Sequence, residues 1–420
     1  MTDPASNRAG SWRWWLCGLL LLASAINYMD RQTLANASVR ISTEFQLKQE
    51  QYGNLELAFG WAFAVGSLFF GVLVDRISVR WVYPTVLFLW SATGFATGLV
   101  EGYSGLLVCR TALGLFEAGH WPCAVKATQR LLEPKDRSMG NSVLQSGTSI
   151  GAIITPLIMR ALMTEAPGSW RIAFQIIGAI GVLWLILWFW LVRAGDLEPD
   201  PANVPTSPSR VRGQSIWSVI LSRRMLVVIV VIALINTGWQ IIRAWLPKFL
   251  MEGRGYSESA ALYFNSLFYV ATDVGCIGAG VLTLWWHRKG MTVHGARLFA
   301  FGFCAALSAL TLLAVALPKG WMMLGMLLLV GAGALGVFPI YHALTQDLSR
   351  EHQGTVTGIG GVAAWILSPA QKYFGRLVDS TGSFDLGFAV VGCLPLLAFL
   401  VLWWLWEEPA SSNRYEPKGS

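Results

Sequence analysis

The sequence predicts an all-α polytopic membrane protein with about twelve transmembrane helices in two six-helix halves. Three observations lead to this prediction. Of the 420 residues, 54% are hydrophobic and only 13% are charged, whereas a soluble domain contains about 25% charged residues. Apolar runs of membrane-spanning length recur along the chain, and one long polar segment divides it near the middle.

The apolar runs give the expected spans. A spanning helix needs about 20 mostly apolar residues, because the hydrocarbon core is roughly 30 Å thick. The first run has no small-residue cleavage site and ends in Asp30 and Arg31, so it is interpreted as a retained helix and not as a signal peptide. The expected spans are 13–36, 52–74, 81–100, 104–126, 140–162 and 171–193, followed by 224–247, 260–285, 295–316, 321–344, 355–378 and 385–406.

The polar segment is rich in Pro, Ser and Arg, which is typical of a flexible linker. The predicted domains are therefore a first half at 1–193, a linker at 194–223 and a second half at 224–420. A shift of 209 residues aligns Ile26-Asn27 with Ile235-Asn236, and a shift of 214 aligns Gly168-Ser169 with Gly382-Ser383. These matches indicate a duplicated unit. Duplicated transporters bind their substrate between the repeats near the bilayer midplane.

The basic residues predict the orientation. If the amino terminus is cytoplasmic, cytoplasmic segments contain 19 of the 31 Lys and Arg residues, external segments nine, and spans three. This asymmetry follows the positive-inside rule and places both termini in the cytoplasm, in an inner or plasma membrane. The net charge of +7 therefore reflects topology, and we expect a monomer in the lipid bilayer with no nucleic-acid partner. The six cysteines lie singly in apolar runs without ligand spacing, so neither a metal site nor a disulfide framework is expected. No cofactor is expected either.

Two motifs carry a resemblance to a known superfamily. The run GVLVDRISVR at residues 71–80 resembles the G-x-x-x-D-R-x-G-x-R loop of the major facilitator superfamily, with Ser78 in place of Gly. The run RTALGLFEAG at 110–119 is similar to its R-x-x-x-G-x-x-E-A motif. Both lie at the expected ends of the expected spans. The resemblance implies the major facilitator fold over essentially the whole chain.

Shorter runs narrow the resemblance. NYMDR at 27–31 is similar to the N-Y-x-D-R signature of the anion:cation symporter family, and FEAGHWP at 116–122 resembles its F-E-A-P-x-x-P motif with Gly119 in place of Pro. RAWLP at 243–247 and ALYFNSL at 261–267 look most like hexuronate and other sugar-acid transporters. The resemblance implies a secondary transporter that imports a carboxylate substrate with protons, H⁺ being the expected coupling ion.

Ionisable residues inside spans are candidates for the site, because a buried charge is unfavourable unless it is paired or lines a water-filled cavity. Arg31 presents a planar fork that matches a carboxylate. Asn236, Gln240 and Arg243 recur at four and three residues and predict a polar stripe. Two alternatives stay open: Asp30 and Arg31 form a structural pair, or Arg243 extends to water. The candidate substrate-binding residues are Arg31, Tyr28, Gln145, Asn236, Gln240 and Arg243.

The candidate proton-coupling residues are Asp30, Glu117 and His120. Glu117 lies two helical turns after Arg110 on nearly the same face, and His120 follows three residues later. The alternatives are a fixed Arg110–Glu117 pair and a His120 that only packs. We expect a conformational role for the motif residues Asp75, Arg76, Arg80 and Arg110, the first three at the cytoplasmic face.

These features predict proton-coupled import of an organic anion, a hexuronate or a related sugar acid, with alternating access. Three other transport functions stay open: import of another small carboxylate, anion antiport, and facilitated passage of a neutral solute. A membrane sensor is less well supported, since the linker contains no recognisable signalling domain. An enzyme is not expected, because the sequence shows no phosphate loop, nucleophile elbow or metal-spaced cluster.

Overall fold

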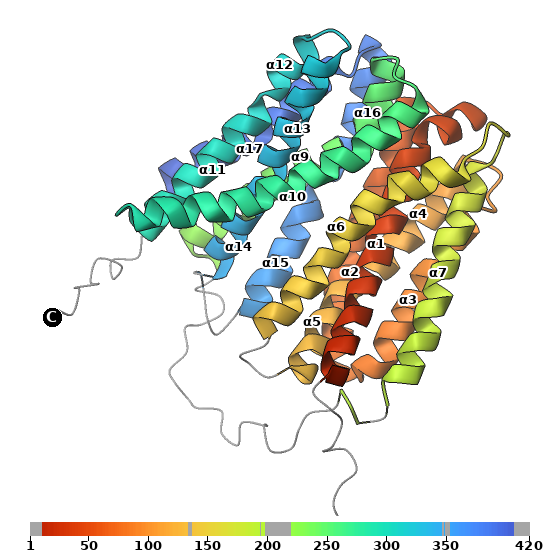
Figure 1. Ribbon diagram of the computed structural model, residues 1–420, viewed down its shortest axis with the longest axis vertical. Coiled ribbons are helices and arrows are strands. Elements are labelled where there is room, and N and C mark those ends of the chain that lie inside the picture. Colours follow the sequence, from red (N-terminus) through yellow and green to blue (C-terminus); the bar gives the residue numbers. More distant parts are fainter. Residues whose placement is uncertain are drawn as a thin grey trace, which may run out of the picture.

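The computed structural model describes residues 11–132, 137–193, 195–197, 220–346, 348 and 353–406. This part of the chain is all-helical and forms two lobes that lie side by side (Figure 1). Most of the predicted linker, 194–223, lies outside the described residues, so the predicted domain boundaries stay a prediction.

The first lobe contains the helices that precede the linker. They are α1 (Ser11–Glu44), α2 (Gln49–Arg76), α3 (Val79–Thr97), α4 (Tyr103–Glu117), α5 (His120–Leu131), α6 (Arg137–Leu162) and α7 (Trp170–Leu191). The second lobe contains α9 (Arg223–Lys248), the π-helical turn η3 (Phe249–Gly253), α10 (Glu258–Arg288), α11 (Val293–Ala309), α12 (Thr311–Ala316), α13 (Trp321–Gly336), α14 (Phe338–Gln346), α15 (Gln353–Ile366), α16 (Pro369–Thr381) and α17 (Asp385–Leu405). The bundle is therefore an all-α membrane architecture of two six-span halves.

Four expected spans are interrupted, each being built from two consecutive helices. The pairs are α4 with α5, α11 with α12, α13 with α14, and α15 with α16. Pro122, Pro339 and Pro369 lie within the first three residues of α5, α14 and α16. Proline lacks a backbone N–H and clashes with the preceding turn, so it ends or kinks a helix. The length of an apolar run predicts the length of a span, but it does not predict where the helix breaks within the span.

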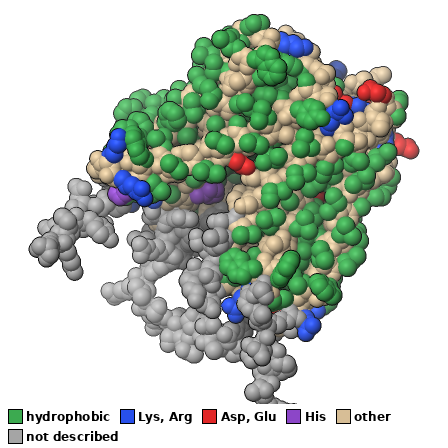
Figure 2. All heavy atoms as spheres, viewed as in Figure 1, with side chains coloured by type: hydrophobic (Ala, Val, Ile, Leu, Met, Phe, Trp, Pro, Cys, Tyr) green, Lys and Arg blue, Asp and Glu red, His purple; other side chains and the backbone are tan. Residues whose placement is uncertain are grey.

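Seven helical segments among the described residues are long and apolar enough by themselves to cross a membrane. The other five expected spans are also helical and pack in the same bundle. Hydrophobic side chains cover much of the face drawn in Figure 2. Trp190, Ile277 and Val274 are among the large apolar side chains that the bundle leaves exposed. Such a surface is unfavourable in water and favourable against lipid.

The cores show how the lobes meet. We call the end of the bundle where α7 ends and α9 begins the linker end, and the opposite end the far end. At the far end one core includes both lobes, with Tyr52 of α2 and Trp245 of α9 in edge contact at 4.9 Å between ring centroids. At the linker end the cores are almost entirely separate, one around Trp184 of α7 and another around Val228 of α9. The lobes are therefore joined at the far end and diverge toward the linker end.

Candidate functional site

A cluster of six ionisable side chains is buried inside the bundle. Each is at most 6% exposed, although three are guanidinium groups and three are carboxyl groups. Charged groups at such positions mark substrate or proton pathways in membrane proteins. The cluster consists of Asp30 and Arg31 on α1, Glu56 on α2, Arg110 and Glu117 on α4, and Arg243 on α9.

Arg31 forms an ion pair with Glu117 inside the first lobe. Its Nε donates to Oε2 of Glu117 at 2.5 Å. The guanidinium carbon lies 4.7 Å from the ring centroid of Phe63 and 5.5 Å from that of Phe59. No ion pair joins Arg31 to Asp30 in the part of the chain that the structure describes. The expected alternatives of an Asp30–Arg31 pair and an Arg110–Glu117 pair are therefore both wrong for this conformation.

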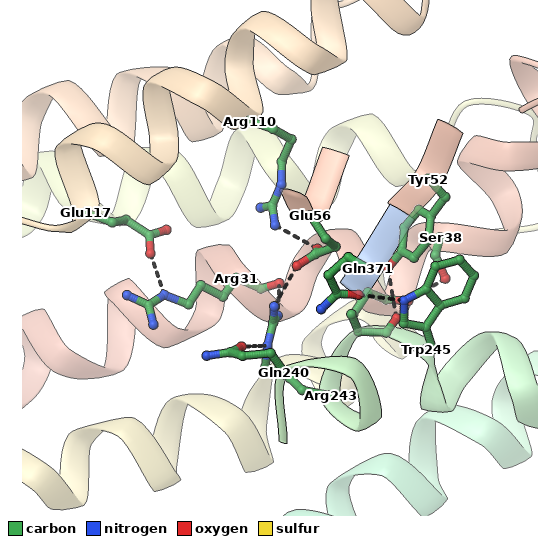
Figure 3. A network of polar contacts seen from close by, with 12 residues as sticks. Arg31, Ser38, Tyr52, Glu56, Arg110, Glu117, Gln240, Arg243, Trp245 and Gln371 are labelled. Atoms are coloured by element: carbon green, nitrogen blue, oxygen red, sulfur yellow. Dashed lines mark hydrogen bonds and ion pairs between the residues drawn. The ribbon is translucent and has the colours of Figure 1, made fainter. Parts of the chain in front are cut away.

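Glu56 joins the two lobes. Its Oε1 accepts a hydrogen bond from Nη2 of Arg110 at 2.8 Å, and its Oε2 accepts one from Nη2 of Arg243 at 2.7 Å (Figure 3). Arg110 belongs to the first lobe and Arg243 to the second. Nε of Arg243 also donates to Oε1 of Gln240 at 2.8 Å. Arg243 is only 1% exposed, so the alternative that it extends to water is wrong.

Glu56 is not among the residues predicted from the sequence. It is an acidic residue inside the expected span 52–74, outside any motif that we recognised. A survey of every carboxylate inside an expected span identifies it, because an intramembrane charge is a functional candidate even without a motif. The sequence does not indicate that Glu56 pairs with Arg110 and Arg243.

Several polar atoms of the cluster have no hydrogen-bond partner among the described residues. They include the donors Nη2 of Arg31 and Nε and Nη1 of Arg110. They also include the acceptors Oδ2 of Asp30 and Oε1 of Glu117. A buried polar group without a partner is unfavourable by about 1–3 kcal/mol, and by more if it is charged. The cluster can therefore bind an anion through its donors and protons at its carboxyl oxygens.

A small pocket lies beside this cluster, between α9 and the α15–α16 region, and its lining combines apolar residues with four neutral polar ones. The polar ones are the side chains of Thr237, Gln240, Ser368 and Gln371. Gln371 accepts a hydrogen bond at Oε1 from Nε1 of Trp245 at 2.7 Å, and Gln240 holds the guanidinium of Arg243. Hydroxyl and amide groups of this kind match the hydroxyls of a polar solute.

The remaining predicted substrate residues are placed differently. Tyr28 is half-buried, and its ring centroid lies 5.8 Å from the guanidinium carbon of Arg31. Asn236 donates from Nδ2 to a carbonyl of its own helix at 2.9 Å. Gln145 on α6 is exposed and donates to Oγ1 of Thr148 at 3.3 Å, again inside one helix. The structure thus places Arg243 in the cluster and Tyr28 and Gln240 beside it, whereas Gln145 and Asn236 bond within their own helices.

His120 is fully buried inside the first lobe, and both of its ring nitrogens have partners. Nε2 lies 3.0 Å from Oγ of Ser24, and Nδ1 lies 3.0 Å from Oη of Tyr83. The indole rings of Trp90 and Trp121 pack against the imidazole, with centroid distances of 5.9 and 5.1 Å. This environment is that of a hydrogen-bonded packing residue.

The motif residues of the loop after α2 lie at the linker end. Arg76 is exposed, and the side chain of Asp75 lies outside the described residues. Nε of Arg80 donates to the carbonyl of Val192, next to the end of α7, at 3.4 Å, and its guanidinium carbon lies 5.2 Å from the ring centroid of Trp81. These residues are therefore at the end where the lobes diverge.

Two helical lobes with ionisable groups buried between them define a membrane transport protein. Residues 20–370 match the Major Facilitator Superfamily, and the chain belongs to this superfamily. It is accordingly a transporter and not an enzyme.

Named relatives and a solved structure agree with this assignment. The chain is 26% identical to the hexuronate transporter of Escherichia coli (strain K12), with 93% of each chain covered. It is 24% identical to the galacturonate transporter of Dickeya chrysanthemi, with 78% of this chain and 91% of that chain covered. The fold also matches an inward-facing bacterial homolog of the human lysosomal transporter Spinster, with a TM-score of 0.74, 16% identity and 95% of each chain covered.

Proposed function

We propose that this transporter imports a hexuronate or a related sugar acid together with protons. The observation that carries the proposal is the buried guanidinium of Arg31, which uses Nε for Glu117 and leaves Nη2 without a partner among the described residues. A carboxylate is the natural ligand of such a fork. The names of the relatives, hexuronate and galacturonate transporters, support a sugar acid as the substrate.

The Arg31–Glu117 pair suggests how proton and anion binding are linked. An ionised Glu117 occupies Nε of Arg31 and competes with a substrate carboxylate for the same fork. A proton on Glu117 weakens that competition, because a neutral carboxyl is a poorer acceptor than a carboxylate. The proton and the anion therefore favour each other's binding, and linkage makes this effect reciprocal.

Asp30 is the second candidate carrier of a coupling proton. It is 3% exposed, and its Oδ2 has no partner among the described residues. A buried carboxylate without a partner is unfavourable, so a proton stabilises Asp30 in this conformation. A proton on Glu117 together with one bound anion leaves the net charge of the cluster unchanged, so the site can close around the anion without an added unpaired charge.

The hydroxyls of the substrate are expected to reach the polar groups of the small pocket when the lobes rearrange around it. Thr237, Gln240, Ser368 and Gln371 supply hydroxyl and amide groups, and Tyr28 supplies a further hydroxyl beside Arg31. The carboxylate-binding residue then belongs to the first lobe and the hydroxyl-binding groups mainly to the second. A substrate held in this way contacts both lobes, which favours their closure around it.

The arrangement of the cores supports alternating access. With the linker end in the cytoplasm, as the distribution of Lys and Arg predicts, the joined far end is external and this conformation is inward-facing. Rocking of the lobes then opens the far end and closes the linker end. Both termini lie in the cytoplasm in this orientation.

Uptake into proteoliposomes tests the proposal. We expect radiolabelled D-glucuronate or D-galacturonate to accumulate when the lumen is alkaline relative to the medium, and a protonophore to abolish the accumulation. Neutral D-glucose serves as the control solute. Glu117→Gln is expected to lose accumulation against the gradient. Normal transport by this variant both down and against a pH gradient contradicts the coupling assignment.

The same assay separates the alternatives. If the substrate is another small carboxylate, we expect simple organic acids to accumulate in the vesicles and sugar acids not to accumulate. Antiport predicts uptake only into vesicles that already contain an anion. A neutral-solute facilitator predicts that Arg31→Ala leaves transport unchanged.

A further inference from the structure

Charged residues meet across the boundary between the lobes at two depths. Near the far-end surface, Glu50 of α2 pairs with Arg376 and Lys372 of α16, and Glu50 and Arg376 are 29% and 55% exposed at their side chains. Deeper in the bundle, Glu56 of the same helix pairs with Arg243 of α9, and these side chains are 0% and 1% exposed. Both pairs join the lobes, but only the deeper one is shielded from water.

The deeper pair is attached unequally to the two lobes. Glu56 also binds Arg110 of α4, and α2 and α4 pack so closely that a Cβ at Gly114 would collide with the backbone of Phe59. Glu56 and Arg110 therefore move together with the first lobe. Arg243 belongs to α9 and moves with the second lobe. Opening of the far end separates Glu56 from Arg243 and leaves Glu56 bound to Arg110.

This asymmetry has an electrostatic consequence. After separation Glu56 keeps a cationic partner, whereas Arg243 loses its anionic partner. A guanidinium is unfavourable in a weakly polar environment unless water or an anion replaces that partner. In the closed empty transporter Glu56 supplies the anion. In the open transporter the cavity supplies water or an anionic solute.

We propose that Glu56 is an internal counter-anion for Arg243. Glu56 holds the far end closed in the empty transporter, and when the far end opens its place at Arg243 is taken by the solute carboxylate that Arg31 also binds, Arg31 and Arg243 being neighbours across the lobe boundary. The first part depends only on the alternation of the two lobes. The second part rests on the proposed anionic substrate. Arg243 thus has a second function beside the substrate binding expected from its sequence position, because the state of the second lobe depends on whether Glu56 or a solute anion is bound to it.

Distance measurements on the full-length protein in lipid nanodiscs test the first part without any substrate. Spin labels on unnatural amino acids at Glu101 and Ser380, both exposed at the far end of opposite lobes, report on far-end opening. Labels at Ile77 and Lys289 report on the linker end. We expect Glu56→Gln to raise the ratio of open to closed far ends by at least about tenfold, because it leaves Arg243 without an anionic partner in the closed state.

The matched control is Glu50→Gln, which removes a carboxylate from the same helix and the same lobe boundary. Its pair is solvent-exposed, so we expect a shift below about threefold. Equal shifts for Glu56→Gln and Glu50→Gln contradict the proposal. This comparison is independent of the substrate, so a failure of sugar-acid uptake leaves its outcome unchanged.

A double-mutant cycle covers the case in which Glu56→Gln folds poorly. Arg243→Gln leaves Glu56 paired with Arg110, and we expect a smaller shift than for Glu56→Gln. The double variant Glu56→Gln/Arg243→Gln contains no unpaired guanidinium at this position, so it should lie closer to the wild type than Glu56→Gln alone. The counter-anion role is overturned if the double variant opens the far end as much as Glu56→Gln does. It is also overturned if Arg243→Gln alone opens the far end as much as Glu56→Gln does.

Chemical rescue tests whether a free carboxylate can take the place of Glu56 at Arg243, which the second part requires. Formate is small enough to occupy the space of the missing carboxylate in Glu56→Ala. We expect formate, and not chloride at the same ionic strength, to restore the short far-end distance in this variant. Equal effects of formate and chloride contradict replacement of Glu56 by a carboxylate.

Discussion

Nε of Arg31 and Oε2 of Glu117 lie 2.5 Å apart, and both side chains are buried in the first lobe. The pair joins α1 to the last residue of α4, immediately before the break that precedes α5. The buried guanidinium of Arg31, which offers a planar fork to a substrate carboxylate, is thus already half-occupied by a protein carboxylate. Several predictions on transport and on conformation depend on this geometry and on that of the lobe boundary.

Arg31→Lys is expected to reduce uptake at least about tenfold, which corresponds to about 1.4 kcal/mol, even though the charge is retained. An ammonium cannot present two parallel N–H groups, so Lys contacts Glu117 or the substrate but does not bind both as Arg does. The measurement is initial uptake of a labelled sugar acid into proteoliposomes. The matched control is Arg171→Lys, whose pair with Glu44 in the same lobe is partly exposed; there we expect a change below about twofold. Equal losses in the two variants argue against a carboxylate fork at Arg31.

Phe63→Leu is expected to raise the KM for the substrate by about threefold to thirtyfold. The aromatic face of Phe63, 4.7 Å from the guanidinium carbon of Arg31, stabilises the cation and fixes its orientation, and Leu preserves the apolar volume without the ring. Phe69→Leu on the same helix is the control, because the side chain of Phe69 is exposed on the outer surface. A KM that is unchanged in both variants shows that the ring does not contribute to the site.

Gly53→Ala is expected to favour the open far end. A Cβ at Gly53 would meet the backbone carbonyl group of Gln371 on α16, so the lobes could not approach as closely. We expect the ratio of open to closed far ends to rise at least about tenfold, measured with the spin labels described above. Gly71→Ala on the same helix has open space around its added methyl group and controls for helix propensity. A larger shift for Gly71→Ala than for Gly53→Ala contradicts a close crossing of α2 and α16.

His120→Ala is expected to lower the thermal unfolding midpoint and leave the pH at half-maximal uptake unchanged. The substitution removes the hydrogen bonds to Ser24 and Tyr83 and leaves a cavity among indole rings, a loss of about 2 kcal/mol or more. Thermal unfolding in detergent and a pH profile of uptake provide the two readouts. Ser24→Ala, which removes one of the two hydrogen bonds, should fall between the variant and the wild type in stability. A shifted pH profile with unchanged stability instead indicates a proton-coupling role for His120.

Individual residues of the candidate site could be predicted from the sequence where a charged side chain interrupts an apolar run. Asp30, Arg31, Glu117 and Arg243 are charged residues inside apolar runs, and the structure buries all of them. Glu56 is also a charged residue inside an apolar run, but no recognisable motif surrounds it, and it was not predicted. The partners were not predictable. Helical periodicity suggested that Arg110 faces Glu117, whereas Arg110 binds Glu56 on a neighbouring helix.

The sequence by itself determined the number and length of the apolar runs, their division by a polar segment and the asymmetry of Lys and Arg. These properties depend on the free energy of transferring residues from water to lipid, and this free energy is nearly a sum of contributions from single side chains. Only the tertiary structure decided that Arg31 pairs with Glu117, that Glu56 joins Arg110 to Arg243, and that the lobes share a core at the far end. These relationships depend on the rotation and crossing of helices distant in sequence, which are fixed by packing across the whole bundle.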